Sequence, residues 1–340
     1  MTDNYQATQP RVTIITPSYN QAEFLERTIQ SVLAQGYPNL EYIVLDGGST
    51  DGSLEIIKRY EGQLSYWHSR KDKGQADAIN EGFQKATGKY VAWLNSDDVY
   101  LPGCIEKAVA ILEAHPDCGM AFGQVEVINQ SGTHLGFFRP ASLRFEDLLC
   151  VETIIPQQAA FFRCASLHKV GLLNPDLHFA LDHEFFLRIA THYQITAFSD
   201  VAAQYRLSEN NKGMKQRSKW SYEFIRILDA FFAQPDLKTE WESLYKRAYA
   251  GAYYRGACNF LDDEQYPLAR EWFISAAAQR KQYLLQIKWW RNYIRTFLGE
   301  RGNEFYNKTK LTLAQAGILN IDYDWWTALR KVGTGLPDGK

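Results

Sequence analysis

The sequence predicts an α/β fold, a mostly parallel sheet flanked by helices, followed by an α-helical C-terminal region. Short apolar, β-branched runs alternate with segments of helical periodicity from Arg11 to about Asp98, which is typical of parallel strands joined by helices on both faces of a sheet. From about Ser218 to Trp326 helical patterns dominate, which predicts a separate region. We therefore expect three parts: a polar tail over 1–10, an α/β domain over 11–218 and a helical region over 219–340.

Four strands are expected before Asp98, each an apolar run ended by polar or glycine residues. Helical spacing predicts helices between them, such as the segment 75–86 with apolar residues at Ile79 and Phe83. In such sheets ligands bind beyond the carboxyl ends of the strands. The expected strands are VTIIT from Val12, LEYIVLD from Leu40, LSYWHS from Leu64 and KYVAWLN from Lys89. Acidic residues at their ends, namely Asp46, Asp97 and Asp98, are therefore candidate ligand-binding residues.

The segment from Gly119 to Lys212 mixes strand and helix signals. We expect a strand pair around the turn at 129–132, a further strand before Cys164, a short helix carrying Phe185 and Phe186, and a strand leading into a polar loop. These expectations rest on the segments GMAFGQVEVIN, THLGFFRP, PQQAAFFRC, DHEFFLRIATHY and ITAFSDVAAQYRLSENNKG.

The bulk composition is that of an ordinary globular protein. The chain has 340 residues, 46% hydrophobic and 22% charged, and a net charge of −2, which argues against a protein that binds nucleic acid with its whole surface. Its five cysteines are widely spaced without a CxxC pair, so we expect reduced, mostly buried thiols rather than disulfides or a zinc site. No signal peptide or transmembrane helix is expected. We therefore expect a cytoplasmic protein, at most peripheral at the inner face of a membrane.

The adjacent carboxylates of Asp97 and Asp98 follow an apolar strand directly. Two like charges side by side repel each other unless a cation or a set of donors offsets them. Aspartate also favours turns and helix N-caps, so a plain turn is the alternative.

Five segments in this order resemble family 2 glycosyltransferases with a GT-A fold, over roughly residues 11–212. The resemblance implies a nucleotide-sugar-binding GT-A fold. It also implies inverting transfer of a sugar from a nucleotide diphosphate donor to a glycan or lipid-linked acceptor, in bacterial polysaccharide or cell-surface glycan synthesis. The segments are TIITPSYNQAEFLERTIQSVLAQGYPNLEYIVLDGGSTDGS, DKGQADAINEGF, GKYVAWLNSDD, IPQQAAFFR and LDHEFFLRI.

The acidic doublet suits the chemistry that this resemblance implies. Mg²⁺ and Mn²⁺ are hard cations that bind one or two carboxylates together with phosphate oxygens. Such a metal acts as a Lewis acid on the departing diphosphate. By resemblance to the family's DxD-type motif, Asp98 is the expected direct metal ligand, and Asp97 is a second ligand nearer the ribose.

Further nucleotide-sugar-binding residues are implied near the ends of the first strands. Asp46 resembles the family's nucleotide-binding aspartate, although a strand-end turn aspartate is the alternative. Many members carry a second aspartate next, which commonly contacts the base; Gly47 stands there instead, so the base stays open. Gly48 to Asp51 form a turn whose free backbone N–H groups would help to hold anionic ligands.

The same resemblance implies contacts from outside this turn. Tyr19, which follows Pro17 and the first strand, would stack on the base, with an ordinary partly buried tyrosine as the alternative. Lys73 would reach the nucleotide from a loop, with a solvated surface lysine as the alternative. The family often has a histidine where this chain has Ser208, and Arg206 would then take over phosphate contact together with Lys212.

Asp182 is the candidate general base. The resembled motif is usually Glu-Asp, and Leu181 replaces the glutamate here. A carboxylate near an acceptor hydroxyl can take its proton as the oxygen attacks the anomeric carbon, and a single displacement of this kind inverts the configuration. An N-cap aspartate is the alternative. Glu184 and Gln157 are expected on the acceptor side, with a polar strand edge as the alternative for Gln157.

Two other interpretations stay open at this point. A catalytically silent nucleotide-sugar-binding or scaffold protein would tolerate the departures at Leu181 and Ser208. The segment 281–298 is basic and aromatic without an acidic residue, so it predicts peripheral contact with an anionic membrane; docking on neighbouring helices is the alternative. At helical spacing one face holds Tyr283, Ile287, Trp290, Ile294 and Phe297, and Lys281, Lys288, Arg291 and Arg295 are expected opposite.

Overall fold

The computed structural model describes residues 9–140, 142–208 and 216–315, which form two compact units. The first unit comprises Met1–Leu143 and Ile155–Leu207, and the second comprises Arg144–Ile154 and Ser208–Lys340. The division therefore falls at Leu207 rather than at residue 218. In addition, residues 144–154, which we call the excursion 144–154, lie within the expected α/β domain in sequence but belong to the second unit. Most of the expected tail over 1–10 lies outside the described residues.

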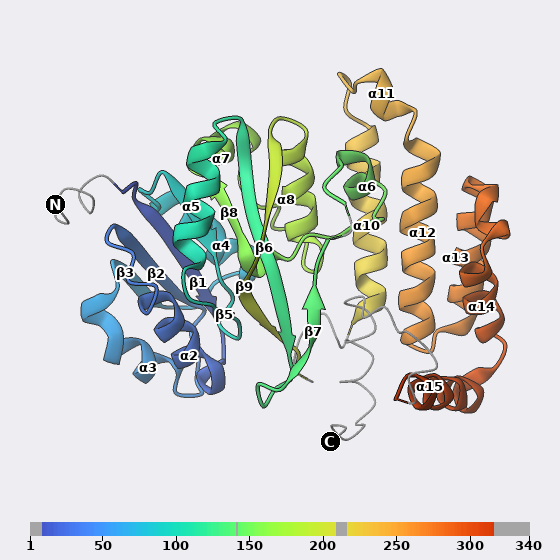
Figure 1. Cartoon of the computed structure of the whole chain (residues 1–340), viewed down its shortest axis with the longest axis horizontal. Coiled ribbons are helices and arrows are strands. Elements are labelled where there is room, and N and C mark those ends of the chain that lie inside the picture. The colour runs from blue at the N-terminus through green and yellow to red at the C-terminus, as the bar shows by residue number, and fades with distance from the viewer. Residues whose placement is uncertain (1–8, 141, 209–215, 316–340) are drawn as a thin grey trace. The chain divides into compact units, whose positions relative to one another are not determined.

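The first unit is built on a nine-stranded mixed sheet whose first half is parallel (Figure 1). The order β3-β2-β1-β4 and the parallel pairing confirm the α/β fold predicted from the alternating apolar runs. The strands β1, β2 and β4 are mostly buried because helices cover the sheet on both sides, whereas the edge strand β3 is half-buried. The four strands are β1 (Val12–Ser18), β2 (Leu40–Asp46), β3 (Tyr66–Ser69) and β4 (Tyr90–Trp93).

The second half of the sheet extends from β4 through strands of mixed direction. The long strand β6 (Cys118–Ile128) pairs antiparallel with β7 (His134–Phe138) and β8 (Ala160–Arg163), and parallel with β9 (Gln194–Arg206). The short strand β5 (Val99–Tyr100) pairs antiparallel with β9. The expected strand pair around 129–132 is therefore confirmed as β6 and β7.

Among the described residues, six α-helices flank this sheet, as can be followed in Figure 1. The helix expected over 75–86 is confirmed, and so is the short helix carrying Phe185 and Phe186. The helices are α2 (Ala22–Leu33), α3 (Ser53–Tyr60), α4 (Gln75–Lys85), α5 (Cys104–Ala114), α7 (Cys164–Val170) and α8 (Leu181–Ala190).

An aromatic cluster holds α8 against the sheet. The ring of Trp93, the last residue of β4, stacks on Phe162 of β8 with centroids 5.3 Å apart. Phe185 of α8 lies 6.2 Å from Trp93 and 5.3 Å from Phe162, and Phe83 of α4 lies 6.0 Å from Phe185. Because these side chains are buried, the position of α8 is tied to the end of β4.

The second unit is helical, as expected for the C-terminal region. A core of alanine and aromatic residues packs α12 against α13 and α14. The excursion 144–154 joins it because Phe145 of α6 packs on Phe231 and Trp241, with ring centroids 6.0 and 4.8 Å apart. The helices are α6 (Phe145–Leu149), α10 (Arg217–Phe232), α11 (Thr239–Glu242), α12 (Tyr245–Asp262), α13 (Tyr266–Gln279), α14 (Ile287–Arg295) and α15 (Gly299–Gln315).

The segment 281–298 departs from the single helix that was expected. A 3₁₀ turn over Lys281–Leu285 ends before Gln286, and α14 begins at Ile287. The break rotates Tyr283 into the core, and Arg295 is also buried, with its Nε donating to Asn303 Oδ1 at 2.9 Å. The predicted assignment of these two residues to faces was therefore wrong.

All five cysteines are free thiols, three buried and two partly buried. The thiols are therefore mostly buried, as the sequence predicted. Within the described ranges, no helix combines the length and apolarity needed to cross a bilayer.

Candidate functional site

The carboxyl ends of the parallel strands meet at one edge of the sheet. Ser18 pairs with Asp46, and Asp46 pairs with Ser69, so β1, β2 and β3 end level with one another. On the other side of β1, Ile15 pairs with Trp93, after which β4 ends. The loops that follow these strands therefore converge where ligands bind in open α/β sheets.

The acidic doublet lies in a tight turn after β4. The turn closes when the Asp98 N–H donates to Asn95 O at 3.1 Å, and Thr28 Oγ1 donates to Asp98 O at 2.7 Å. The Asp98 carboxylate is fully buried and accepts from Arg206 N at 3.1 Å and from Asn95 Nδ2 at 3.4 Å. Asp97 keeps part of its surface in solvent.

Burial of the two adjacent carboxyl groups disfavours their ionisation. Burial raises the pKa of Asp98 well above its ordinary value, and the charge of Asp97 raises it further. Burial also raises the pKa of Asp97. A cation beside the doublet would favour ionisation of both groups.

Adjacent, oxygen-only ligands fit a hard divalent cation such as Mg²⁺ or Mn²⁺. Within the described part of the chain no group of three or more histidine, cysteine, aspartate or glutamate residues has a metal-binding arrangement. A metal held by Asp97 and Asp98 would therefore need further ligands from phosphate or water.

Arg206, the last residue of β9, holds the acidic turn from within the protein. Its side chain is buried and lies over the ring of Phe24, 4.8 Å from the ring centroid. Nε donates to Asp97 O at 3.1 Å, and Nη1 donates to Asn129 O at 3.3 Å and to Gln130 O at 3.1 Å. These bonds turn the guanidinium toward backbone carbonyls. They favour a positioning role over the expected phosphate contact.

Asp46 organises the loop after β2. Its buried carboxylate accepts hydrogen bonds from Gly48 N at 3.2 Å, Ser49 N at 2.9 Å and Ser69 Oγ at 2.6 Å, and also from Ser49 Oγ. Four donors from two loops therefore hold a single side chain. This is the arrangement of a strand-end turn aspartate, the alternative that the sequence left open.

Asp72, from the loop after β3, places a carboxylate beside Gly47, the position at which many family members carry a second aspartate. A Cβ atom on Gly47 would stand 2.9 Å from Asp72 Oδ2, so Asp72 lies directly against this glycine. Asp72 Oδ1 accepts from Gly74 N at 2.8 Å, which fixes the side chain in the loop after β3. Sequence analysis missed Asp72, although it is the first residue of the DKGQADAINEGF segment. Lys73 beside it is exposed.

The loops after β1 and β2 are joined by side chains. Asn20 Oδ1 accepts from Thr50 N at 2.9 Å, and Asp51 accepts from Ala22 N at 2.9 Å and from Ser53 N at 3.1 Å. Burial opposes ionisation of Asp51, but these hydrogen bonds outweigh it and lower its pKa. Asp51 thus connects the first turns of α2 and α3.

Pro17 and Tyr19 differ in their surroundings. Pro17 is buried within β1, whereas the Tyr19 side chain is 62% exposed just beyond the strand. Tyr19 therefore presents a free ring beside these joined loops, as base stacking requires.

Gln157 is tied to the acidic turn. Its Nε2 donates to Trp93 O at 2.7 Å, and its Oε1 accepts from Asn95 Nδ2 at 3.0 Å. Asn95 Oδ1 in turn accepts from Gln75 Nε2 at 2.8 Å. Asn95 therefore links α4, the doublet and Gln157. Sequence analysis missed it, although it stands three residues before Asp98.

Asp182 lies in the first turn of α8 and is partly exposed. The N-cap position belongs to Ala180, so the N-cap alternative for Asp182 is wrong. The aromatic packing of Phe185 on Trp93 connects this helix to the strand that precedes the doublet.

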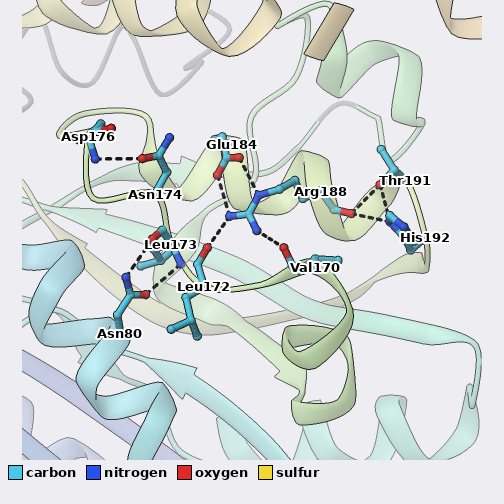
Figure 2. A network of polar contacts seen from close by, with 10 residues as sticks. All are labelled: Asn80, Val170, Leu172, Leu173, Asn174, Asp176, Glu184, Arg188, Thr191 and His192. Carbon is cyan, nitrogen blue, oxygen red and sulfur yellow. Dashed lines mark hydrogen bonds and ion pairs between the residues drawn. The ribbon is translucent and has the colours of Figure 1, made fainter. Parts of the chain in front are cut away.

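Glu184 binds Arg188, and Arg188 holds the segment that precedes Asp182, as Figure 2 shows. Its two carboxylate oxygens accept from Arg188 Nε at 2.6 Å and Nη2 at 2.8 Å. The same guanidinium donates to Leu172 O at 2.7 Å and to Val170 O. Asn80 of α4 exchanges two hydrogen bonds of 2.9 Å with the backbone of Leu173. Glu184 is thus engaged in a scaffold, which argues against direct acceptor contact.

Comparison with known proteins gives the following relatives. Residues 13–171 match the family described as Glycosyl transferase family 2. An uncharacterized glycosyltransferase of Mycobacterium tuberculosis, Rv1514c, is 32% identical over 53% of this chain and 69% of its own length. The putative teichuronic acid biosynthesis glycosyltransferase TuaG of Bacillus subtilis is 36% identical over 42% of this chain and 58% of its own. An uncharacterized glycosyltransferase of Rickettsia bellii is 28% identical over 84% of this chain, which spans only 42% of that relative.

Two solved structures have a similar fold. Staphylococcus aureus TarS in complex with UDP-GlcNAc superposes with a TM-score of 0.62 at 16% identity, over 84% of this chain and 89% of that one. The mannosyltransferase PcManGT of Pyrobaculum calidifontis, in complex with GDP-Man and Mn²⁺, has a TM-score of 0.59 at 20% identity, over 96% and 86%. These likenesses agree with the GT-A fold that the sequence resemblance implied.

Proposed function

This chain belongs to glycosyl transferase family 2, and on that basis we propose that it is an inverting, metal-dependent glycosyltransferase. It would move a sugar from a nucleoside diphosphate donor to a glycan or lipid-linked acceptor in the synthesis of a bacterial cell-surface glycan. The observation that carries the proposal is the acidic turn at the sheet edge. Two adjacent carboxylates follow the buried strand β4 there, where the loops after the parallel strands converge. Burial raises the pKa of both, and the charge of the nearby Arg206 offsets only part of that rise.

We assign the nucleotide to the loops after β1, β2 and β3. Tyr19 offers an exposed ring for stacking. Asp72, in the loop after β3, lies beside Gly47, and Lys73 follows it in the chain with an exposed side chain. Asp46 and Asp51 would act by positioning these loops, because the Asp46 carboxylate accepts from Gly48 N and the Asp51 carboxylate accepts from Ala22 N and Ser53 N. TarS and PcManGT were solved with UDP-GlcNAc and GDP-Man, so uridine and guanosine diphosphates are the first nucleotides to test.

Asp98 and Asp97 would hold Mg²⁺ or Mn²⁺ together with the diphosphate. When bound, the metal would supply Lewis-acid stabilisation of the leaving group. The protein's own contribution is to fix the Asp98 carboxylate. Arg206 and Asn95 donate to it from β9 and from within the turn, so this ligand is held in place before the donor arrives.

Asp182 is the proposed general base. Its carboxylate would accept the proton of the acceptor hydroxyl as that oxygen bonds to the anomeric carbon and the bond from this carbon to the diphosphate breaks. The electron pair of the broken bond leaves with the diphosphate, and the single displacement inverts the configuration. Glu184 and Arg188 would position Asp182 through the 170–174 loop.

The alternative is a protein that binds nucleotide sugars without catalysis, and Asp182→Asn separates the two. If the chain is an enzyme, this variant should lose turnover by about 100-fold or more and retain donor affinity. Asp200→Asn is the control, because Asp200 forms an exposed ion pair with Lys107. Transfer that persists in Asp182→Asn would reject the assigned base. A chain that binds donor but never transfers sugar, with any acceptor tested, would favour the silent protein.

A thermal-shift panel tests the donor and the metal together. Uridine, guanosine, adenosine, cytidine and thymidine diphosphates are added with and without Mn²⁺. A ligand that binds only the folded state raises Tm by mass action, so one nucleotide should raise Tm strongly and only with the metal. No shift with any nucleotide would contradict the proposed function.

A further inference from the structure

The outward face of α14 and of the turn before it is apolar. We call Leu285, Ile287, Trp290, Ile294 and Phe297 the apolar stripe. Their side chains are 85%, 86%, 45%, 54% and 62% exposed. Five large apolar residues exposed close together in the chain are unusual for a surface that only faces water.

The opposite face of α14 already anchors the helix in the second unit. Trp289 is 3% exposed, and its Nε1 donates to Phe273 O at 3.3 Å. Buried Asn292 donates to Tyr254 Oη at 3.3 Å. Arg270 of α13 lies over the Phe297 ring, 4.8 Å from its centroid, but all five side chains of the apolar stripe stay at least 45% exposed. Docking on neighbouring helices, the alternative left by the sequence, therefore does not bury the apolar stripe.

Within residues 281–298 the exposed charges are all positive. Lys281, Lys288 and Arg291 are exposed, and no acidic residue occurs between Lys281 and Gly299. At 3.6 residues per turn, Arg291 lies about 40° from Ile287 around the helix. Arg291 therefore flanks the apolar stripe, whereas Lys288 lies about 100° from Ile287, farther round the helix.

We propose that this face binds the surface of an anionic lipid bilayer. The apolar stripe would enter the boundary between headgroups and acyl chains, and the long side chains of the exposed Lys281, Lys288 and Arg291 would reach lipid phosphates. The Trp290 ring suits the interfacial depth. Charge argues against a second copy of this chain as the occupant, because pairing this face with itself would oppose cation to cation.

Vesicle co-sedimentation of the full chain tests this proposal. Wild-type protein should pellet with phosphatidylcholine vesicles that contain phosphatidylglycerol, and much less with phosphatidylcholine alone. Ile287→Ser/Ile294→Ser should weaken binding about tenfold or more, because it removes buried apolar area. Lys288→Gln/Arg291→Gln should weaken it about thirtyfold at low salt and less at high salt.

Matched controls separate this surface from general effects. Phe137→Ser removes an exposed aromatic ring of the first unit, and Lys58→Gln/Lys246→Gln removes two exposed charges elsewhere; both should bind vesicles like the wild type. Circular dichroism and Tm establish that each variant is folded.

Three results would overturn the proposal. They are wild-type protein that stays in the supernatant with anionic vesicles, binding that survives the isoleucine substitutions, and a wild-type dimer that those substitutions make monomeric. The transferase proposal rests on the first unit, so failure here would leave it unaffected.

Discussion

Asp98 is the residue at which stability and function should conflict. Its carboxylate is buried, and burial together with the charge of Asp97 raises its pKa, so its ionisation at neutral pH costs folding free energy. Asp98→Asn keeps the shape and an acceptor oxygen. We expect the metal-free variant to melt about 2–4 °C above the wild type, as is common when functional groups are removed.

The same variant should lose sugar transfer and the Mn²⁺-dependent rise of Tm with nucleoside diphosphate. Asp200→Asn, the exposed control, should change neither quantity. An Asp98→Asn protein that still shows the full Mn²⁺ effect would remove Asp98 from the proposed metal site.

The pKa shifts of the doublet also predict how metal binding depends on pH. The folded protein raises both pKa values above the ordinary 3.8, so it binds these protons more tightly than the unfolded chain does. The carboxyl groups therefore add stability below about pH 4, and this contribution is lost as the pH rises through the folded values. Metal binding requires the deprotonated forms.

We therefore expect Mn²⁺ with nucleoside diphosphate to raise Tm little near pH 5 and more near pH 8. The measurement is a Tm series with and without the metal across this range. An Mn²⁺ effect of constant size at every pH would contradict the prediction.

At the scale of elements, the segment between α7 and α8 depends on one arginine. The Arg188 guanidinium binds Glu184 and two backbone carbonyls, and the two side chains are only 27% and 17% exposed. Arg188→Ala leaves these acceptors without their donor, so we expect a loss of about 2 kcal/mol in the free energy of unfolding. Urea unfolding measures this loss.

Transfer rate should fall more than donor affinity in Arg188→Ala, because the loop leads to Asp182 and not to the nucleotide loops. Arg59→Ala is the control, since Arg59 forms a more exposed ion pair with Glu26, 3.3 Å apart; it should cost less than about 1 kcal/mol. Equal losses of kcat and donor affinity in Arg188→Ala would indicate general unfolding instead of a positioning effect.

At the scale of the whole molecule, the second unit requires a close approach of two segments. A Cβ atom on Gly251 of α12 would lie 1.9 Å from Cys150 O, so Gly251→Ala must displace the excursion 144–154 from the helices. In an open helix the same substitution would add about 1 kcal/mol of stability. Here we expect a loss of about 3 kcal/mol or more from the second unit.

Hydrogen exchange measures this effect for each unit separately. Protection should fall in α6, α10 and α12 of Gly251→Ala and persist in the parallel strands of the first unit. Gly62→Ala, whose Cβ would meet nothing within 4 Å, is the control and should leave both units unchanged. A uniform loss of protection would show that the two units unfold together.

Local patterns in the sequence determined the order of elements in the first unit. The strands β1, β2 and β4 are predominantly apolar runs because both faces of a parallel sheet are covered, and each run ends within a few residues of a glycine, a proline or a carboxylate. The doublet Asp97-Asp98 could be recognised from the sequence because a buried strand does not continue through two adjacent charges. These signals depend only on neighbours in the chain.

Only the tertiary structure decided which hydrogen-bond partners the polar side chains have. Ser69 reaches Asp46 across 23 residues, Arg206 reaches Asp97 across 109, and Asp72 lies against Gly47. The partners of a hydrogen-bonding side chain depend on which loops the sheet brings together, and apolar periodicity carries no record of that. For the same reason the sequence did not reveal that residues 144–154 belong to the helical unit, or which side of α14 faces solvent.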